Sequence, residues 1–589
     1  MTMTTEASDN LMVKVGGYSE AGIRESNQDA FSSKNPTLAS ELKYKGIVAC
    51  IADGVSCSSN AQQASHTSVT EFVQDYYCTP DSWSVKKSAG QVLHSLNRWL
   101  YQHGSQQDLR HNGSVTTFSS VIFKSTAAYL FHVGDSRIYR LRDGELTQLT
   151  RDHIQGQYGK RHFLVRALGM DINLDIDYQK EDLQKGDLFL LTSDGIHDWL
   201  SHSELTQSLL PLTHLGKLNS AQLEASTQQL ADKAITAGSN DNLSALAIYI
   251  DHVPQEDVTA LFKQLTQFTI PPALGVGNEL DHYTITKVLY SGPRSHIYLA
   301  TNQHDKQDYV LKVPSLNFSE DIAYLEGFAK EQWVGRKLKH RAIMNVFPRP
   351  ENSHFLYHVC EAIDGYTLRQ WMYDNPAPSL ERVRDIVKNI LIAVRVFQRA
   401  GMVHRDLKPE NIMITQDNHI KIIDFGTVQI DGIDEIRSPL NQHNPLGAVN
   451  YIAPEYLHGE QASTRSDLFS VAVITYEMLT GELPYKTLTT QSITQARHIK
   501  WKYRSAITYR NDLPLWIDST LRKACHPLPQ RRYEAKSEFI ADLYTPNNSL
   551  ITEGESGPLI SRNPVRFWQY ITLFFVFMAL VEFYIIFNL

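Results

Sequence analysis

The octet HRDLKPEN occupies residues 404–411, and the triplet DFG follows at residues 424–426. Together they place a carboxylate (Asp406), a lysine (Lys408) and an amide (Asn411) on one stretch, and a second carboxylate (Asp424) after the next apolar run. Phosphoryl transfer from ATP requires such a set, because one group must orient the attacking hydroxyl and hard oxygen atoms must hold Mg²⁺. The pattern therefore predicts phosphoryl-transfer chemistry in this part of the chain.

This spacing resembles the catalytic and metal-binding loops of eukaryotic-type Ser/Thr protein kinases. The resemblance covers residues 281–545 and implies a two-lobed kinase fold that binds ATP with Mg²⁺ and phosphorylates protein substrates. It implies that Asp406 orients the substrate hydroxyl or accepts its proton, and that Lys408 stabilises the transferring phosphoryl group. Asn411 and Asp424 would then be the Mg²⁺ ligands.

Further kinase parts follow in the expected order. Lys312 lies in the apolar run Tyr309–Val313 and would grip the α- and β-phosphates of the nucleotide while pairing with Glu331. The hinge that receives the adenine is expected at residues 360–363. The positions expected to contact the nucleotide or its metal are Lys312, Glu331, Gly292, Glu361, Ile363, Asn411 and Asp424.

Three expectations concern residues after the DFG triplet. Glu455, in the Ala-Pro-Glu triplet at residues 453–455, is expected to pair with Arg532. Asp467 is expected to brace the backbone of the catalytic loop. Thr427 and Ser438 are the two hydroxyl residues between Asp424 and Glu455, and Ser438 is the better candidate for autophosphorylation because it lies mid-segment beside Arg437.

Two departures from the kinase pattern bear on nucleotide binding. The usual G-x-G-x-x-G loop lets backbone amides approach the phosphates. Residues 290–295 read YSGPRS and keep only the middle glycine, Gly292. Ala448 also stands where a threonine hydroxyl normally contacts the catalytic loop. Because the lysine and both key aspartates remain, an active kinase is the leading interpretation, and a nucleotide-sensing pseudokinase is the alternative.

Acidic residues border several strand-like runs in the first 250 residues. Asp53, Asp135 and Asp194 follow such runs, whereas Asp29 and Asp241 precede them. Each aspartate taken singly is most simply a turn residue. Carboxylates on turns are also the ligands that Mg²⁺ and Mn²⁺ prefer, and a pair of such ions can activate water and clamp a phosphoryl group.

In this order the motifs resemble the metal-dependent Ser/Thr protein phosphatases (PPM, type 2C), most closely over VGDSRIYRLRDGELTQLTRDH at residues 133–153. The resemblance implies an α-β-β-α sandwich at residues 11–252 that hydrolyses phosphoproteins by direct attack of water, without a phospho-enzyme. It implies that Asp53 bridges two Mn²⁺ or Mg²⁺ ions, that Asp135 contributes to a third, and that Arg24 holds the substrate phosphate. The implied metal ligands are Asp29, Asp53, Gly54, Asp135, Asp194 and Asp241.

Composition indicates folded domains in a reducing compartment. The 589 residues are 42% hydrophobic and 20% charged, which fits several folded domains and excludes a largely disordered chain. A net charge of −8 gives no sign of a nucleic-acid partner. The five cysteines include no CxxC pair, so we expect free thiols and neither a disulfide framework nor a zinc site.

The hydrophobic pattern predicts a domain order for the chain. The first domain is expected to hold strands at 47–52, 119–123, 128–133, 187–192 and 243–250, and helices at 61–77, 89–101 and 220–237. Residues 253–280 contain several prolines and glycines and are expected to form a short helix and then a linker. Residues 546–566 are polar and are expected to form a tether.

The C-terminal stretch differs from the rest. Residues 567–589 are nearly all apolar or aromatic, and as a helix they would extend roughly 34 Å, enough to cross a hydrocarbon core of about 30 Å. Arg562 and Arg566 flank it, which predicts a single-pass anchor with the catalytic domains in the cytoplasm. Glu582 is the one residue of this stretch whose charge would be costly to place inside a membrane. The alternative for this stretch is a helix buried in a protein core. At the other end of the sequence, residues 1–15 lack the apolar region of a signal peptide.

Together these patterns resemble bacterial bifunctional kinase/phosphatase proteins. The leading hypothesis is a multidomain α+β protein in a bacterial inner membrane that phosphorylates and dephosphorylates protein Ser/Thr. The expected partners are protein and phosphoprotein substrates, ATP and the membrane, with self-association left open. The alternatives are an active phosphatase regulated by a pseudokinase domain, and a signalling scaffold that catalyses neither reaction.

Overall fold

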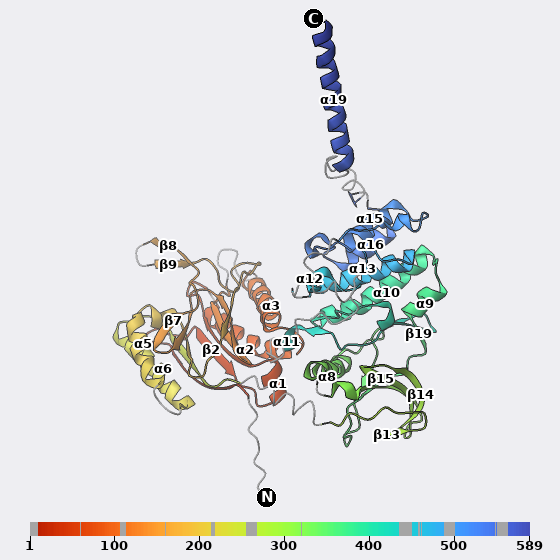
Figure 1. The fold of residues 1–589 in the computed structure, drawn as a ribbon. Coiled ribbons are helices and arrows are strands. Elements are labelled where there is room, and N and C mark those ends of the chain that lie inside the picture. The colour runs from red at the N-terminus through yellow and green to blue at the C-terminus, as the bar shows by residue number, and fades with distance from the viewer. Residues whose placement is uncertain are drawn as a thin grey trace. The chain divides into compact units, whose positions relative to one another are not determined.

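The computed structural model describes most of the chain (Figure 1). The described residues are 10–58, 60–105, 113–158, 161–213, 218–254, 268–319, 321–434, 450–457, 460, 462–487, 501–547, 549–550 and 564–588. Contacts divide the chain into unit 1, Met1–Ala260 with Ile430–Asn441, and unit 2, Leu261–Gln429 with Gln442–Leu589.

Unit 1 contains two five-stranded sheets, and every strand pair that is described within them is antiparallel. The first sheet has the order β1 (Met12–Glu20), β12 (Leu243–His252), β11 (Leu188–Thr192), β6 (Arg137–Arg142), β7 (Glu145–Gln148). The second has the order β10 (Asp177–Asp182), β5 (Ala127–Val133), β4 (Phe118–Lys124), β3 (Ile47–Asp53), β2 (Asp29–Lys34). A separate hairpin joins β8 (Ile154–Tyr158) to β9 (Arg161–Leu164).

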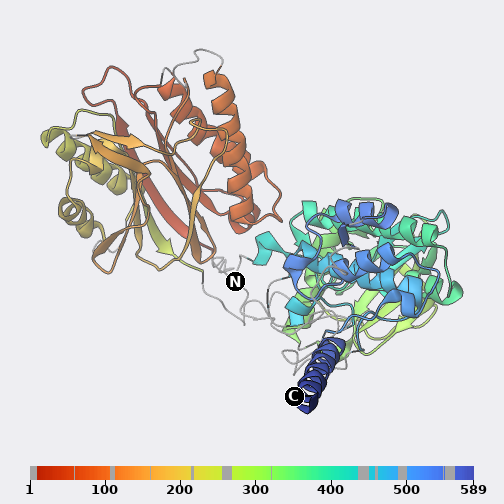
Figure 2. The same cartoon turned by 90° about the horizontal axis from the view of Figure 1, so that it is seen from above.

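Helices cover both outer faces of these sheets, as Figure 2 shows. Helices α2 (Ala61–Cys78) and α3 (Val85–Ser105) pack their apolar residues on the second sheet, and α5 (His202–Thr213) and α6 (Ser220–Thr236) pack on the first. A third cluster, which includes Ile51, Val121 and Ile248, fills the space between the sheets. Strands β4 and β5 are buried along their whole length because each has a helix on one side and a sheet on the other. The predicted α-β-β-α sandwich is confirmed.

The predicted elements of the first domain match the observed ones closely. All five expected strands form, with bounds that differ by one or two residues from those read off the apolar runs. The helix expected at 89–101 is longer, because α3 already begins at Val85 and ends at Ser105. Two short helices, α1 (Ala39–Tyr44) and α4 (Asp194–His197), complete the unit.

Unit 2 begins with a six-stranded sheet and one long helix, α8 (Ile322–Lys337). The strand order is β13 (Glu279–Leu280), β14 (Tyr283–Ser291), β15 (Ser295–Asn302), β16 (Asp308–Pro314), β18 (His358–Glu361), β17 (Val346–Phe347). The remainder is mainly helical, with short strands β19 (Gly365–Thr367), β20 (Met402–Val403), β21 (Ile412–Thr415), β22 (Ile420–Ile422) and β23 (Gln429–Ile430). This division gives the two lobes that the sequence predicts.

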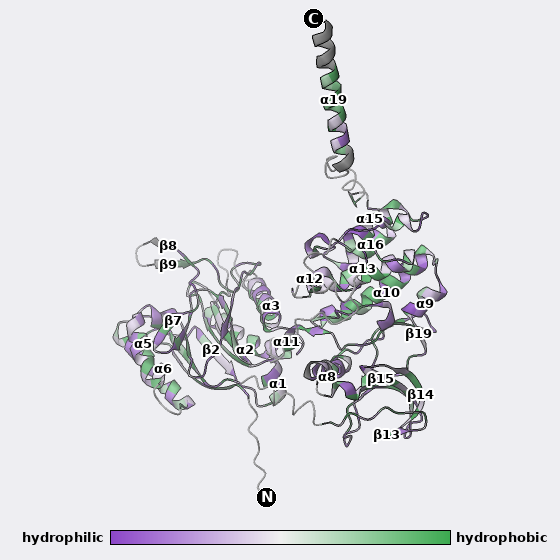
Figure 3. Ribbon diagram, in the orientation of Figure 1, coloured by the Kyte–Doolittle hydropathy of each residue, from purple (hydrophilic) through white to green (hydrophobic). Residues whose placement is uncertain are grey.

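The helical lobe is built on α10 (Leu380–Arg399) and α13 (Thr464–Thr480), whose apolar residues appear green in Figure 3. Nearly all of α13 is buried, so this helix is the central support of the lobe. The other described helices of this lobe are α9 (Leu368–Asp374), α12 (Pro454–Leu457), α15 (Leu515–Ala524), α16 (Lys536–Tyr544) and the single-turn η2 (Pro409–Asn411), η4 (Ala506–Thr508) and η5 (Pro529–Arg531). The single-turn η1 (Leu316–Phe318) precedes α8. The short helix α11 (Asp431–Asp434) belongs to the segment that groups with unit 1.

The segment expected to be a linker contributes to unit 2. Thr269 forms a parallel bridge with Phe355, and Ile270 is buried in a small apolar cluster with Leu325 and Phe328. The prolines and glycines of the segment suggested irregular chain, but apolar residues beside them gain burial against the lobe. Residues 255–267, where a short helix was expected, lie outside the described residues.

A helix, α19 (Pro564–Asn588), forms where a membrane span was expected. Its side chains are described over residues 567–580 and are mostly exposed, including Leu573 and Phe575. Across the residues that the structure describes, no helix has the length and apolar character needed to cross a membrane.

Candidate active sites

Five aspartates of unit 1 lie at strand ends or on adjoining turns. Asp29 begins β2 and is the direct cross-strand partner of Asp53, which ends β3. Asp194 is the first residue of α4 and follows β11 closely. Asp135 lies in the turn between β5 and β6, and Asp241 lies just before β12.

Burial and mutual repulsion dominate the electrostatics of this set. Burial, reinforced by the charge of Asp29 and then of Asp194, raises the pKa of Asp53 well above its ordinary value. Burial raises the pKa of Asp194 to about 8 and the pKa values of Asp29 and Asp135 to about 6. Burial and the proximity of like charges both disfavour the ionised form of a carboxylate.

The donor set fits hard divalent cations. Asp29 Oδ1 is buried and has no hydrogen-bond partner among the described residues, while its Oδ2 accepts a hydrogen bond of 2.7 Å from Ser193 Oγ. Oxygen atoms are the ligands that Mg²⁺ and Mn²⁺ prefer. Within the described part of the chain, however, no group of three or more acidic, histidine or cysteine side chains is already arranged to hold an ion.

Arg24 engages one member of the acidic set directly. Its Nη2 lies 2.7 Å from Asp241 Oδ2, and its Nε donates to the carbonyl oxygen of Asn240 at 3.0 Å. The side chain of Arg24 remains 41% exposed, so the guanidinium borders the acidic set from the solvent side. The structure therefore brings Arg24 to one carboxylate of the set, although the two residues are 217 positions apart. Its expected role in holding the substrate phosphate stays a prediction.

Asn242 holds this arrangement together and was not singled out from the sequence. Its Oδ1 accepts from the N–H of Gln28, and its Nδ2 donates to the carbonyl oxygens of Ala21 and Ser26. It thereby fastens the loop that carries Arg24 to the start of β12. The signal was present, since Asn242 directly follows Asp241, but its partners lie 214 to 221 positions earlier in the chain.

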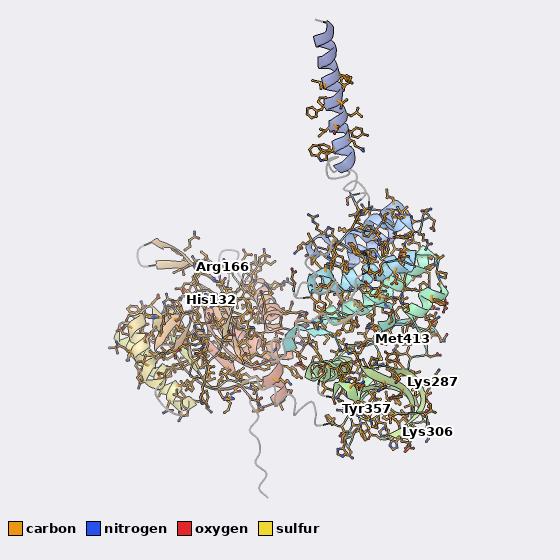
Figure 4. The ribbon with its side chains drawn as sticks, in the orientation of Figure 1. His132, Arg166, Lys287, Lys306, Tyr357 and Met413 are labelled. Atoms are coloured by element: carbon orange, nitrogen blue, oxygen red, sulfur yellow. The ribbon has the colours of Figure 1, made fainter. Side chains whose placement is uncertain are left out.

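A histidine at the end of the 133–153 stretch was also missed. His153 Nδ1 accepts from the N–H of Gly134 at 3.1 Å, and its Nε2 donates to Asp177 at 3.1 Å. Its ring lies 4.8 Å from that of His132, which Figure 4 labels together with Arg166. His153 therefore ties the turn that carries Asp135 to the neighbouring strand β10.

Lys312 of unit 2 contacts its expected partner, Glu331, and also Asp424, a contact that the sequence did not predict. Lys312 Nζ lies 2.8 Å from both carboxylate oxygens of Glu331 and 3.2 Å from Asp424 Oδ1. Burial acts to lower the pKa of Lys312, but the facing carboxylates outweigh it and the net shift is upward. Burial acts to raise the pKa of Asp424, yet Lys312 brings it down to about 2, so this aspartate stays ionised. The predicted Lys312–Glu331 pair is confirmed.

The catalytic-loop residues converge on Asp406. Lys408 Nζ lies 2.8 Å from Asp406 Oδ2, and Asn411 Nδ2 donates to the same oxygen at 3.0 Å. Asp467 accepts from the N–H groups of His404 and Arg405, which gives the expected brace. This brace holds the loop in an unusual shape, because Arg405 has φ of 68°, in the left-handed region.

Two further expectations have different outcomes. Glu455 and Arg532 form the predicted pair through two hydrogen bonds of 2.6 and 2.7 Å, and both side chains are buried. Ser438 and Ala448 lie outside the described residues, so the expectations for them stay predictions.

In the expected hinge, the side chain of Glu361 is already engaged in contacts within the protein. The carboxylate of Glu361 accepts from Lys421 Nζ at 2.7 and 2.8 Å and from the N–H of Asn345. Any contact of Glu361 with a nucleotide would therefore involve its main chain. Ile363 follows β18 in irregular, half-buried chain.

The loop that replaces the usual glycine-rich motif is held at its tip. The N–H of Gly292 donates to the carbonyl oxygen of Ser295 at 3.1 Å, and a Cβ at Gly292 would lie 2.3 Å from the hydroxyl of Tyr290. The carbonyl oxygen of Arg294 accepts from Tyr324 Oη at 2.6 Å, which fastens the loop to α8. Sequence reasoning missed the Tyr324 contact, since it joins residues 30 positions apart.

Two family models match the chain. Residues 17–233 match "Protein phosphatase 2C", and residues 283–542 match "Protein kinase domain". The serine/threonine-protein kinase PrkC of Bacillus subtilis is 27% identical over 263 residues, which are 45% of this chain and 40% of that protein. PknB of Mycolicibacterium smegmatis is 29% identical over 267 residues, covering 45% and 42% respectively. The chain thus spans less than half the length of these two curated kinases.

Solved structures resemble each part. The serine/threonine phosphatase PstP/Ppp of Mycobacterium tuberculosis is 21% identical and covers 41% of this chain and 99% of its own, with a TM-score of 0.34. The PknI kinase domain of Mycobacterium tuberculosis is 25% identical and covers 46% and 99%, with a TM-score of 0.36.

Proposed function

This chain is a fusion of a protein phosphatase 2C domain with a protein kinase domain, and we propose that it catalyses two opposed reactions on protein serine and threonine. The observation that supports this most directly is that each domain assembles its own carboxylate set. Unit 1 gathers aspartates with raised pKa values, and unit 2 pairs Lys312 with Glu331 and Asp424.

The kinase role follows from the contacts in unit 2. Asp406 would orient the substrate hydroxyl and accept its proton, and Lys408, 2.8 Å away, would stabilise the phosphoryl group during transfer. Asn411 and Asp424 would hold Mg²⁺ bound with ATP. Lys312 would bind the phosphates, held in place by Glu331.

The phosphatase role follows from the acidic set in unit 1. The residues that would hold Mn²⁺ or Mg²⁺ are Asp29, Asp53, Gly54, Asp135, Asp194 and Asp241. Two bound metal ions would supply Lewis acidity and an activated water. Arg24 would hold the substrate phosphate, since its exposed guanidinium borders the carboxylates and suits bidentate binding of an oxyanion.

The test measures both activities in the full chain. The protein is incubated with labelled ATP and Mg²⁺, and separately with a phosphopeptide and Mn²⁺. Asp424→Asn should abolish labelling alone, and Asp53→Asn should abolish hydrolysis alone. Asp417→Asn and Asp143→Asn, at exposed turn positions, are the matched controls. If the wild type shows neither labelling nor hydrolysis, the signalling-scaffold alternative replaces this proposal.

A nucleotide sensor without turnover is the second candidate function for unit 2. The observation that favours it is the hydroxyl of Tyr290, which lies against Gly292 where a kinase of this type has open glycine backbone. A sensor would show a higher Tm with ATP and Mg²⁺ but no label on itself or on any peptide. Label that Asp424→Asn removes would exclude it.

The two domains are proposed to act on a common target. Because they share one chain, each is at a high effective concentration for the other. The phosphatase would then remove phosphates that the kinase adds to the same polypeptide. If Asp53→Asn leaves the phosphate content of the kinase domain unchanged, this coupling is wrong.

Membrane attachment through α19 is a separate proposal. It is supported by exposed apolar side chains on that helix, among them Leu573, Phe574 and Phe577. The chain would be anchored in a bacterial inner membrane with both domains in the cytoplasm. Flotation of the full chain with anionic lipid vesicles tests this: Phe574→Asp with Phe577→Asp should abolish flotation, and Glu582→Gln should not.

A further inference from the structure

The guanidinium of Arg369 lies among two carboxylates and a phenol near the catalytic loop. Its Nε donates to Glu410 at 2.7 Å and its Nη1 donates to Glu477 at 2.8 Å. Its Nη2 donates to the hydroxyl of Tyr451, and that hydroxyl donates to the other oxygen of Glu477 at 2.6 Å. All three nitrogen atoms of the guanidinium therefore donate hydrogen bonds.

Each member of this cluster is held independently. Arg369 lies in the first turn of α9, which is capped by Thr367 Oγ1 accepting from the N–H of Gln370. Glu477 belongs to the buried helix α13, the same helix that supplies the Asp467 brace. Tyr451 is fixed because its carbonyl oxygen accepts from Ser470 Oγ. The cluster is thus a built feature of the lobe.

The cluster also borders the place of phosphoryl transfer. Glu410 lies two residues after Lys408, and the next residue, Asn411, donates to the carboxylate of Asp406. An extended peptide advances about 3.3 Å per residue. When its serine reaches Asp406, a side chain two or three positions away lies roughly 7–10 Å along the peptide.

The cluster has the chemistry of a cation site. Two carboxylates placed for separate N–H donors suit a guanidinium, because its planar fork gives charge-assisted hydrogen bonds with fixed directions. The side chain of Glu477 is only 12% exposed, so leaving it without a cation would be costly. In this structure the cation is supplied by the chain itself.

We propose that Arg369 is a specificity-determining residue that occupies this carboxylate pair in cis and so denies it to a basic side chain of the protein substrate. The inference rests on the proposed kinase function and adds its substrate class. The kinase would accept target serines and threonines without requiring an arginine at the neighbouring position that would otherwise face Glu410 and Glu477. Removing the guanidinium opens the pair and creates such a requirement.

The experiment compares the full-length wild type with Arg369→Met, which retains an unbranched apolar stem. Peptides with one serine carry either Arg or Gln at each position within four residues of it. The wild type should show less than about twofold preference for Arg, whereas Arg369→Met should gain about tenfold in kcat/KM for Arg at one position, as expected for one charge-assisted contact. Adding Glu477→Gln should remove that gain, and Arg382→Met, at an exposed site on α10, should not produce it.

A merely structural role gives a different result. If Arg369→Met lowers kcat/KM for all peptides equally and creates no preference, the proposal is overturned. The same holds if the wild type already prefers Arg at one position and loses that preference on Glu477→Gln. Arg369→Gln replaces Arg369→Met if circular dichroism shows that the latter is unfolded.

A binding measurement separates this proposal from the kinase function itself. Fluorescence anisotropy with a non-hydrolysable ATP analogue should show the Arg peptide bound about tenfold more tightly by Arg369→Met than by the wild type, with no change for the Gln peptide. If the wild type labels no peptide, the kinase function fails while this comparison still decides the role of Arg369. Equal affinities for both peptides in the variant would reject it.

Discussion

Lys312 Nζ lies 2.8 Å from both carboxylate oxygens of Glu331, although one residue is on strand β16 and the other on helix α8. The pair joins the sheet of unit 2 to its long helix and leaves the lysine facing Asp424. A shift of α8 would therefore also move Lys312, which we propose binds the nucleotide phosphates. The pair is largely shielded, with the Glu331 side chain only 3% exposed.

Glu331→Gln should reduce kinase activity strongly. A charge-assisted pair would become one neutral hydrogen bond, a loss of about 1.5–3 kcal/mol that corresponds to roughly 10- to 100-fold in rate. Labelling from ATP measures it, and Glu351→Gln at an exposed position is the control. Hydrolysis of a phosphopeptide by unit 1 should not change. An unaltered labelling rate would show that the pair does not position the lysine.

Arg532→Met should destabilise unit 2 far more than loss of a surface pair. Arg532 and Glu455 are both buried, and removing one partner leaves a buried charge uncompensated at a cost of about 3–5 kcal/mol. Glu534→Gln breaks the exposed pair with Arg465 and should cost at most about 1 kcal/mol. Urea unfolding of the full chain compares the two variants. Equal midpoints for both would contradict the assigned difference.

Stability of metal-free unit 1 should depend on pH through its aspartates. The pKa of Asp194 is about 8 and the pKa values of Asp29 and Asp135 are about 6, all above the ordinary value of 3.8. The folded state therefore binds more protons than the unfolded state between about pH 4 and 8, so stability should fall as pH rises through that window. Thermal unfolding in chelator at pH 5.5 and 8 tests the sign.

Added Mn²⁺ should reverse this trend. Metal binding requires ionised carboxylates, so protons compete with the ion at low pH. The rise in Tm on adding Mn²⁺ should be larger at pH 8 than at pH 5.5. Asp194→Asn should remove most of the difference, and a rise that is independent of pH would argue against these aspartates as ligands.

Gly195→Ala should damage the acidic set of unit 1. A Cβ at Gly195 would lie 2.0 Å from the carbonyl oxygen of Asn242, beside Asp194 and Asp241, so the backbone would have to move. Phosphopeptide hydrolysis and Tm should both fall. Gly90 lies in the second turn of α3, where an added Cβ would meet no atom within 4 Å outside the helix's own backbone. Gly90→Ala should therefore stabilise the fold by up to about 1 kcal/mol. If the two substitutions had the same effect, the predicted clash at Gly195 would be wrong.

Much of the architecture was predictable because its signals are local. Apolar runs marked the buried strands of unit 1, and motifs marked the Lys312–Glu331 and Glu455–Arg532 pairs, which the structure confirms. The segment at 268–280 was not predictable, since its prolines suggested a linker while its burial depends on residues near 325 and 355. Burial of that kind leaves no periodic pattern in the sequence.

By itself the sequence determined the two domains, their order, and the candidate residues for phosphoryl chemistry, because strand and helix periodicity and motif spacings are properties of short stretches. Only the tertiary structure decided how those residues are held and what competes for them. Arg24 meets Asp241, and Arg369 meets Glu477, across 217 and 108 positions. Charged side chains so far apart in sequence are brought together only by packing. Packing lets Asn242 hold the loop that carries Arg24, and it places Arg369 against Glu410 and Glu477.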